Sequence, residues 1–68
     1  MIYLKLKDYK NQDKILRFDH TTGRQELHDT QSKKWETVNI VYDYLLSYSD
    51  KFELYDEIDE SEVSNYAA

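Results

Sequence analysis

The sequence predicts a small α+β domain: an antiparallel sheet of three to five strands arranged as a meander, with one helix packed across a face. Three observations lead to this fold class. Apolar and polar residues alternate at the start of the chain, turn-forming residues recur at short intervals up to residue 37, and the apolar period then becomes helical. A chain of 68 residues makes one domain, with a core near the lower limit of stability.

Residues 1–7 predict the first strand. Ile2, Leu4 and Leu6 fall on one side of it and polar or amphipathic residues on the other, which is typical of a half-buried strand. A polar connection follows. Residues 14–19 then predict a second strand, because they are rich in β-branched, aromatic and other apolar residues.

Residues 19–24 form the clearest turn in the chain. Asp19 can accept hydrogen bonds from backbone N–H groups ahead of it, and Gly23, the only glycine, can adopt the positive φ that ends a type I turn with a bulge. Strands over 25–28 and 33–37, separated by a second short turn, complete the meander.

A helix is predicted after Thr37, because the next apolar residues recur three and four positions apart. The stripe consists of Val38, Val41, Tyr42, Leu45 and Leu46. Thr37 or Asn39 can cap the start of the helix, and Ser49 with Asp50 can end it. Residues 52–55 alternate again and favour a last strand, although they could also open a second helix.

We expect residues 1–58 to form the domain and residues 59–68 to form an acidic, frayed tail with few apolar residues to order it. The expected core consists of Ile2, Leu4, Leu6, Leu16, Phe18, Leu27, Trp35, Val38, Val41, Leu45 and Leu54.

Charge divides the chain into two unlike halves. Residues 1–34 carry eight Lys or Arg against five Asp or Glu, a balance of +3, whereas residues 35–68 carry one Lys against nine acids, a balance of −8. This asymmetry indicates an acidic face. Direct binding of nucleic acid by that face is not expected, because phosphate contacts require clustered Lys and Arg.

The residues needed for most catalytic or metal chemistry are missing. The chain has no cysteine, and its single glycine cannot build a phosphate-binding loop. His20 and His28, each beside an aspartate, are interpreted as solvated turn residues, and the acidic stretch 56–62 lacks the frame of a calcium loop. We therefore expect no enzyme activity, no metal and no cofactor.

The location expected for the protein is the cytoplasm, without membrane association. No apolar run has the length of a membrane span, and the alternating start is unlike a signal peptide. The absence of cysteine fits a reducing compartment.

Tyrosine is unusually frequent, with seven in the chain. One interpretation is that these residues fill a small core and its margins. The other is a binding face, because Tyr44 and Tyr48 are four residues apart on a second face of the predicted helix and acids surround them in sequence. The candidate partner-binding residues are Asp43, Tyr44, Tyr48, Asp50, Glu53, Tyr55, Asp56, Glu57, Asp59 and Glu60.

The leading functional hypothesis is a non-catalytic inhibitor that docks this acidic, tyrosine-bearing face on a basic, nucleic-acid-binding surface of a host protein. Residues with A/T-rich codons number 24, against five for Gly, Ala, Arg and Pro, which indicates a low-GC genome and favours a phage or mobile element. In size, charge and composition the chain is similar to the uracil-DNA glycosylase inhibitors and to several anti-CRISPR proteins, some of which act as DNA mimics.

Two alternatives stay open. The first is a homodimeric structural or accessory module of a larger complex, in which the acids serve solubility. The second is nucleic-acid binding by the basic residues of the N-terminal strands, which are Lys5, Lys7, Lys10, Lys14, Arg17 and Arg24.

Overall fold

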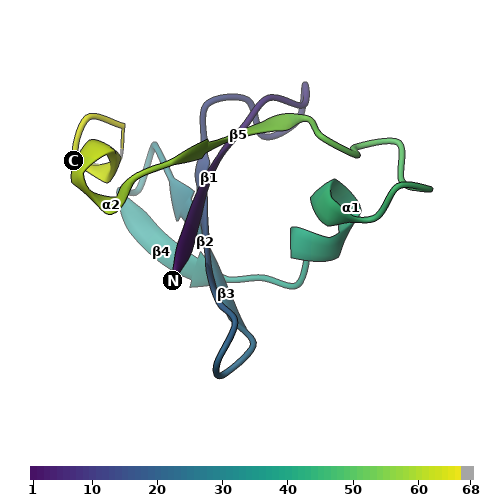
Figure 1. The fold of residues 1–68 in the computed structure, drawn as a ribbon. Coiled ribbons are helices and arrows are strands. Elements are labelled where there is room, and N and C mark those ends of the chain that lie inside the picture. Colours follow the sequence, from purple (N-terminus) through teal and green to yellow (C-terminus); the bar gives the residue numbers. More distant parts are fainter. Residues whose placement is uncertain (67–68) are drawn as a thin grey trace.

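The computed structural model describes residues 1–66 and shows a five-stranded antiparallel sheet with two short helices (Figure 1). The strands are β1 (Ile2–Leu6), β2 (Ile15–Asp19), β3 (Arg24–Asp29), β4 (Lys34–Thr37) and β5 (Tyr55–Ile58), and the helices are α1 (Val41–Leu45) and α2 (Glu60–Val63). The strand order is β4-β3-β2-β1-β5, so that β4 and β5 form the two edges. The prediction of a small antiparallel α+β fold is confirmed.

The β2–β3 and β3–β4 hairpins use the same turn. In the first, the N–H of Gly23 donates to the carbonyl of Asp19 at 2.7 Å, and the Asp19 side chain accepts from the N–H of Thr21 at 2.9 Å. Asp29 and Lys33 repeat both features at the second turn, where Lys33 takes the position of the glycine at a φ of 59°. The predicted glycine turn is confirmed, with a φ of 78° at Gly23.

These turn hydrogen bonds also lower the pKa values of the two aspartates. The N–H of Thr21 holds the pKa of Asp19 below its usual value, and the N–H of Gln31 does the same for Asp29. Both aspartates therefore stay ionised and keep accepting the backbone hydrogen bonds that shape the two turns.

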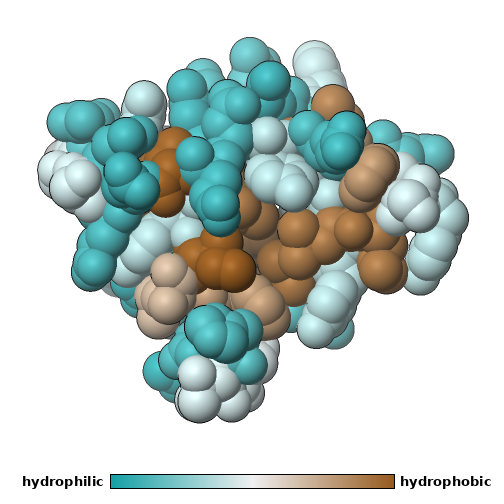
Figure 2. Space-filling view, in the orientation of Figure 1, coloured by the Kyte–Doolittle hydropathy of each residue, from teal (hydrophilic) through white to brown (hydrophobic). Residues whose placement is uncertain are grey.

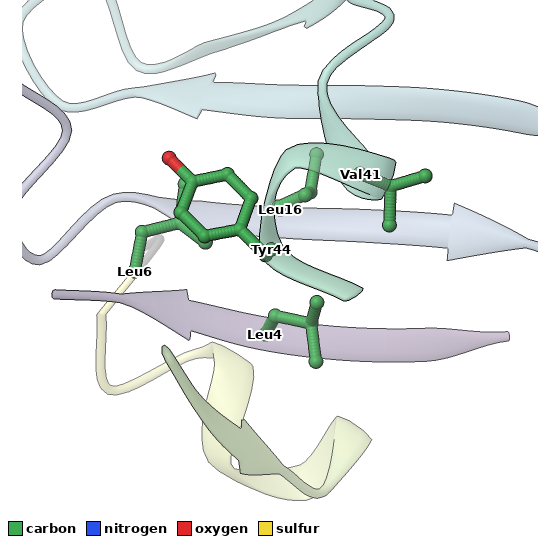
Figure 3. Packing of buried hydrophobic residues seen from close by; sticks show 5 residues of the cluster. All are labelled: Leu4, Leu6, Leu16, Val41 and Tyr44. Carbon is green, nitrogen blue, oxygen red and sulfur yellow. The ribbon is translucent and has the colours of Figure 1, made fainter. Parts of the chain in front are cut away.

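The main core lies on the face of the sheet that α1 contacts (Figure 3). Its buried residues are Leu4, Leu6, Leu16, Val41 and Tyr44, and half-buried Ile2, Phe18, Leu27 and Val38 pack against them. The registers Leu4↔Leu16 and Leu16↔Leu27 place these apolar side chains side by side. Eight of the expected core residues are thus confirmed in or against this cluster.

The placement of Trp35 in this core was wrong. Strand alternation and the pairs Arg17↔Glu26 and His28↔Trp35 place Trp35 on the opposite face of the sheet. There its half-buried ring lies 3.9 Å from the Arg17 guanidinium and meets the His28 ring edge-on at 5.1 Å. Ile15, which the predicted core omitted, is fully buried on that face.

The helix is shorter than predicted, and the placement of Leu45 and Leu54 in the core was wrong. Leu45 is the last residue of α1, and Leu54 lies in the connection before β5, because the last strand covers Tyr55–Ile58 and not the expected residues 52–55; both leucines are exposed. α1 contributes only two buried side chains, Val41 and Tyr44. Packing of a helix across a whole face of the sheet stays a prediction.

α2 lies on the other side of the sheet from α1 (Figure 1). It contacts β1, with Val63 half-buried and the Tyr66 ring 4.7 Å from the Lys5 ammonium. The division into a domain at 1–58 and a frayed tail at 59–68 stays a prediction, and its last two positions, 67 and 68, lie outside the described residues.

Candidate functional site

A buried polar cluster ties α1 to the loop between β1 and β2. The hydroxyl of Tyr44 donates to Oδ1 of Asp8 at 2.7 Å, and Nδ2 of Asn11 donates to the same hydroxyl at 3.2 Å. All three residues are buried. Burial, and then the hydrogen bond to Asp8, raise the pKa of Tyr44 above its ordinary value of 10.0, so the phenol stays neutral and keeps donating.

Lys51, the one basic residue of the C-terminal half, belongs to the same cluster. Its ammonium lies 3.9 Å from Oδ2 of Asp8 and 5.8 Å from the centre of the Tyr44 ring. The side chain is thus directed toward the buried carboxylate. It does not neutralise the exposed acids on either side of it in sequence.

A side chain from β3 caps the start of α1. Oε1 of Gln25 accepts from the N–H groups of both Ile40 and Val41 at 2.8 Å, and Nε2 of Gln25 donates to Oδ1 of Asn39 at 3.3 Å. The expectation that Thr37 or Asn39 caps the helix was wrong: α1 has no cap from its own N-cap side chain. Gln25 is itself buried, which fixes the helix start to the sheet.

The segment from Leu46 to Leu54, which joins α1 to β5, is held by its own hydrogen bonds. The N–H groups of Ser49, Phe52 and Leu54 each donate to the carbonyl three residues earlier, at 3.0–3.1 Å. The N–H of Glu53 reaches back to the carbonyl of Tyr44 at 3.1 Å, and Glu53 adopts a φ of 63°. This connection is therefore a folded scaffold tied to α1.

Nine of the ten candidate residues are at least partly accessible, and one is not. Tyr44 is 0% exposed, so its placement on an outer helix face was wrong. Its aromatic ring fills the core while its hydroxyl reaches the buried Asp8, which a surface position would not allow. Tyr55 is half-buried against the core, and Tyr48 is 84% exposed. The remaining candidates are exposed: Asp43, Asp50, Glu53, Asp56, Glu57, Asp59 and Glu60.

These residues lie on α1 and the connection after it, on β5, and at the start of α2, elements that Figure 1 labels. Asp43, Asp50 and Glu53, here called the acidic rim, lie on α1 and the connection that follows it. Four further acids, here called the acidic edge, lie on the edge strand β5 and at the start of α2: Asp56, Glu57, Asp59 and Glu60. Within residues 1–66, Asp56 is the one acid of the C-terminal half in an ion pair, 3.7 Å from Lys7.

The sequence analysis missed a set of exposed apolar residues beside the rim. Six of the nine large apolar side chains that are exposed in residues 1–66 fall between positions 42 and 54. We call this set the apolar patch: Tyr42, Leu45, Leu46, Tyr48, Phe52 and Leu54. The available signal was the Ser47–Asp50 stretch, because a helix that ends before it leaves the later apolar residues without a place in the core.

Half of the basic side chains considered for nucleic-acid binding form ion pairs with carboxylates. Arg17 lies 2.9 Å from Glu26, and Lys5 lies 3.8 Å from Asp13. With the Lys7–Asp56 pair, three of the six basic residues considered for nucleic-acid binding lie beside an acid. Such pairing reduces the positive potential that phosphate binding requires.

No protein-family model matches the chain, and no curated protein or solved structure matches it. Within the described residues, no three His, Asp or Glu side chains are grouped as metal ligands would be. Neither helix in that part of the chain has the length and apolar character needed to cross a membrane.

Proposed function

We propose that this protein is a small non-catalytic binding protein that docks its acidic C-terminal half on a basic surface of a protein partner. The partner surface is of the kind that holds nucleic acid, and the protein acts as an inhibitor encoded by a phage or mobile element. The supporting observation is the set of exposed carboxylates on α1, the connection after it, β5 and the start of α2, of which only Asp56 has an ion-pair partner within residues 1–66.

The charges explain why a protein is favoured as the partner. Exposed carboxylates without counterions attract a basic surface over a distance of about one Debye length, ~8 Å at physiological ionic strength. The same charges repel nucleic acid and anionic lipid. The exposed apolar patch adds surface that a protein partner can desolvate.

The test uses charge reversal. The variant Asp43→Lys, Glu53→Lys, Asp56→Lys, Glu57→Lys changes four exposed side chains and should stay folded. Tagged wild-type protein should retain a partner from a lysate of a low-GC bacterium, and the variant should not. Binding of the purified partner should weaken with salt and compete with a DNA or RNA duplex. Equal binding by the variant would show that the acids do not form the interface.

A homodimeric module is the second candidate, favoured by the same exposed apolar residues. Molar mass measured by light scattering over a range of concentrations separates the two. A stable dimer that retains no partner would replace the proposal with this candidate.

A further inference from the structure

The apolar patch is concentrated in one part of the molecular surface. Single exposed apolar residues are ordinary, but six within thirteen positions are not. Figure 2 shows apolar side chains gathered over α1 and the region beside it. Phe18 extends the patch toward the sheet, because its ring meets the Tyr42 ring edge-on at 6.3 Å.

The patch is held in place before any partner arrives. α1 is fixed at its start by Gln25 and at Tyr44 by Asp8, and the connection after it is closed by hydrogen bonds between residues three apart. A surface that is already ordered loses little conformational entropy on binding. Such a surface suits a docking site.

The acidic residues around the patch favour a basic binding partner. Asp43 is adjacent to Tyr42 in the chain, and Glu53 lies between Phe52 and Leu54, so acids flank the apolar side chains at both ends of the segment. Lys51 is directed toward Asp8 and leaves these acids uncompensated. A second copy docked by two-fold symmetry would bring the same acids face to face, which like-charge repulsion opposes.

Resting on the proposed function, we infer that the apolar patch is the central contact of the interface and that it receives a basic amphipathic helix of the partner. Leucine-like side chains of that helix cover Leu45, Leu46 and Phe52, while its Lys and Arg meet the acidic rim. The acidic edge on β5 lies outside this contact and contributes through long-range attraction.

The probe for this inference is a synthetic helical peptide of about 18 residues, with leucines on one face and lysines on the other. One control peptide replaces its lysines with glutamates, and another replaces its leucines with serines. Binding is followed by amide chemical shifts of labelled protein. The leucine–lysine peptide should shift residues 42–54 and should bind at least tenfold more tightly than either control.

Two variants test the contact residues. Phe52→Ser should weaken the peptide at least tenfold, and Tyr48→Ser, which alters an 84% exposed side chain and cannot disturb the core, should weaken it about threefold. Tyr9→Ser, at a 98% exposed position outside the patch, is the matched control and should change nothing. Shifts confined to the acidic edge, equal binding of the glutamate peptide, or full affinity in both patch variants would overturn the inference.

The outcome that would contradict the proposed function differs from the one that would contradict the role of the apolar patch. If the four-lysine variant loses the purified partner while Phe52→Ser and Tyr48→Ser bind it as wild type does, charge-driven docking stands and the role of the apolar patch is wrong. If the four-lysine variant binds that partner as well as wild type, the proposed function is wrong whatever the peptide does.

Discussion

The hydroxyl of Tyr44 and the carboxylate of Asp8 are 36 residues apart in sequence and form a buried hydrogen bond of 2.7 Å. The bond joins α1 to the first loop of the sheet, and so it positions the segment that carries the apolar patch. Tyr44→Phe keeps the ring in the core but leaves the Asp8 carboxylate without this donor. We expect a loss of about 1–3 kcal/mol in the free energy of unfolding, measured with urea. Tyr48→Phe, at an exposed hydroxyl, should change it by less than about 0.5 kcal/mol.

The same pair predicts how stability depends on pH. The pKa of Tyr44 is raised in the folded protein, so the folded state keeps this proton at pH values where the unfolded chain has lost it. The stabilisation is complete below the ordinary pKa of 10.0 and decreases as the pH rises above it. Unfolding free energies should therefore fall as the pH rises above about 10, and less steeply in Tyr44→Phe. Equal slopes in the two proteins would assign the fall to other groups.

Gln25 makes the second connection between α1 and the sheet. Replacing it with methionine preserves length and volume but removes the acceptor shared by the N–H groups of Ile40 and Val41. Because two donors at the helix start then lose their partner, we expect about 2 kcal/mol of destabilisation. Faster amide exchange at both residues would show that the cap is the cause. Unchanged exchange would mean that α1 is held by its buried side chains alone.

Gly23 and Lys33 occupy equivalent left-handed positions in the two turns. Replacing Gly23 with alanine should destabilise the protein, whereas replacing Lys33 with glycine should stabilise it. Gly23→Ala costs about 1 kcal/mol through backbone conformation alone, because a Cβ at Gly23 has no heavy atom within 4 Å. Lys33→Gly relieves the same strain at a φ of 59° and should stabilise by roughly 0.5–1 kcal/mol. Ser32→Gly, in the same turn, is the control and should destabilise. Thermal melts that move in the same direction for both left-handed positions would contradict this account.

The first four strands and the turns after β2 and β3 could be predicted because their causes are local, whereas the last strand was expected over 52–55 and lies at Tyr55–Ile58. Alternation at Ile2, Leu4 and Leu6, and the Asp19–Gly23 turn, depend on residues that are neighbours in sequence. The helix could not be predicted as well, since its start depends on Gln25, about fifteen residues earlier, and the burial of Tyr44 depends on Asp8. Helical spacing alone therefore predicted a buried Tyr42 and an accessible Tyr44, whereas Tyr42 is exposed and Tyr44 is buried.

Of the candidate site, the sequence could predict the exposed acidic residues but not the exposed apolar ones. Exposed acids could be read from composition, since carboxylates are rarely buried without a partner. The apolar patch could not, because its exposure follows from the early end of α1 at Leu45. The last two residues of the stripe, Leu45 and Leu46, which a longer helix would have carried into the core, became surface instead.

The last prediction concerns whether the acids on β5 serve solubility or a partner. β5 is an edge strand, and an unguarded edge can pair with the edge of another molecule. Asp56→Thr with Glu57→Thr removes two charges from that edge and adds β-forming side chains. If those charges guard the edge, sedimentation should show association that increases with concentration. Asp43→Thr with Asp50→Thr removes the same charge away from β5 and should not associate. If the edge variant sediments as wild type does, negative charge on β5 is not needed for solubility, and the case that it serves partner binding is strengthened.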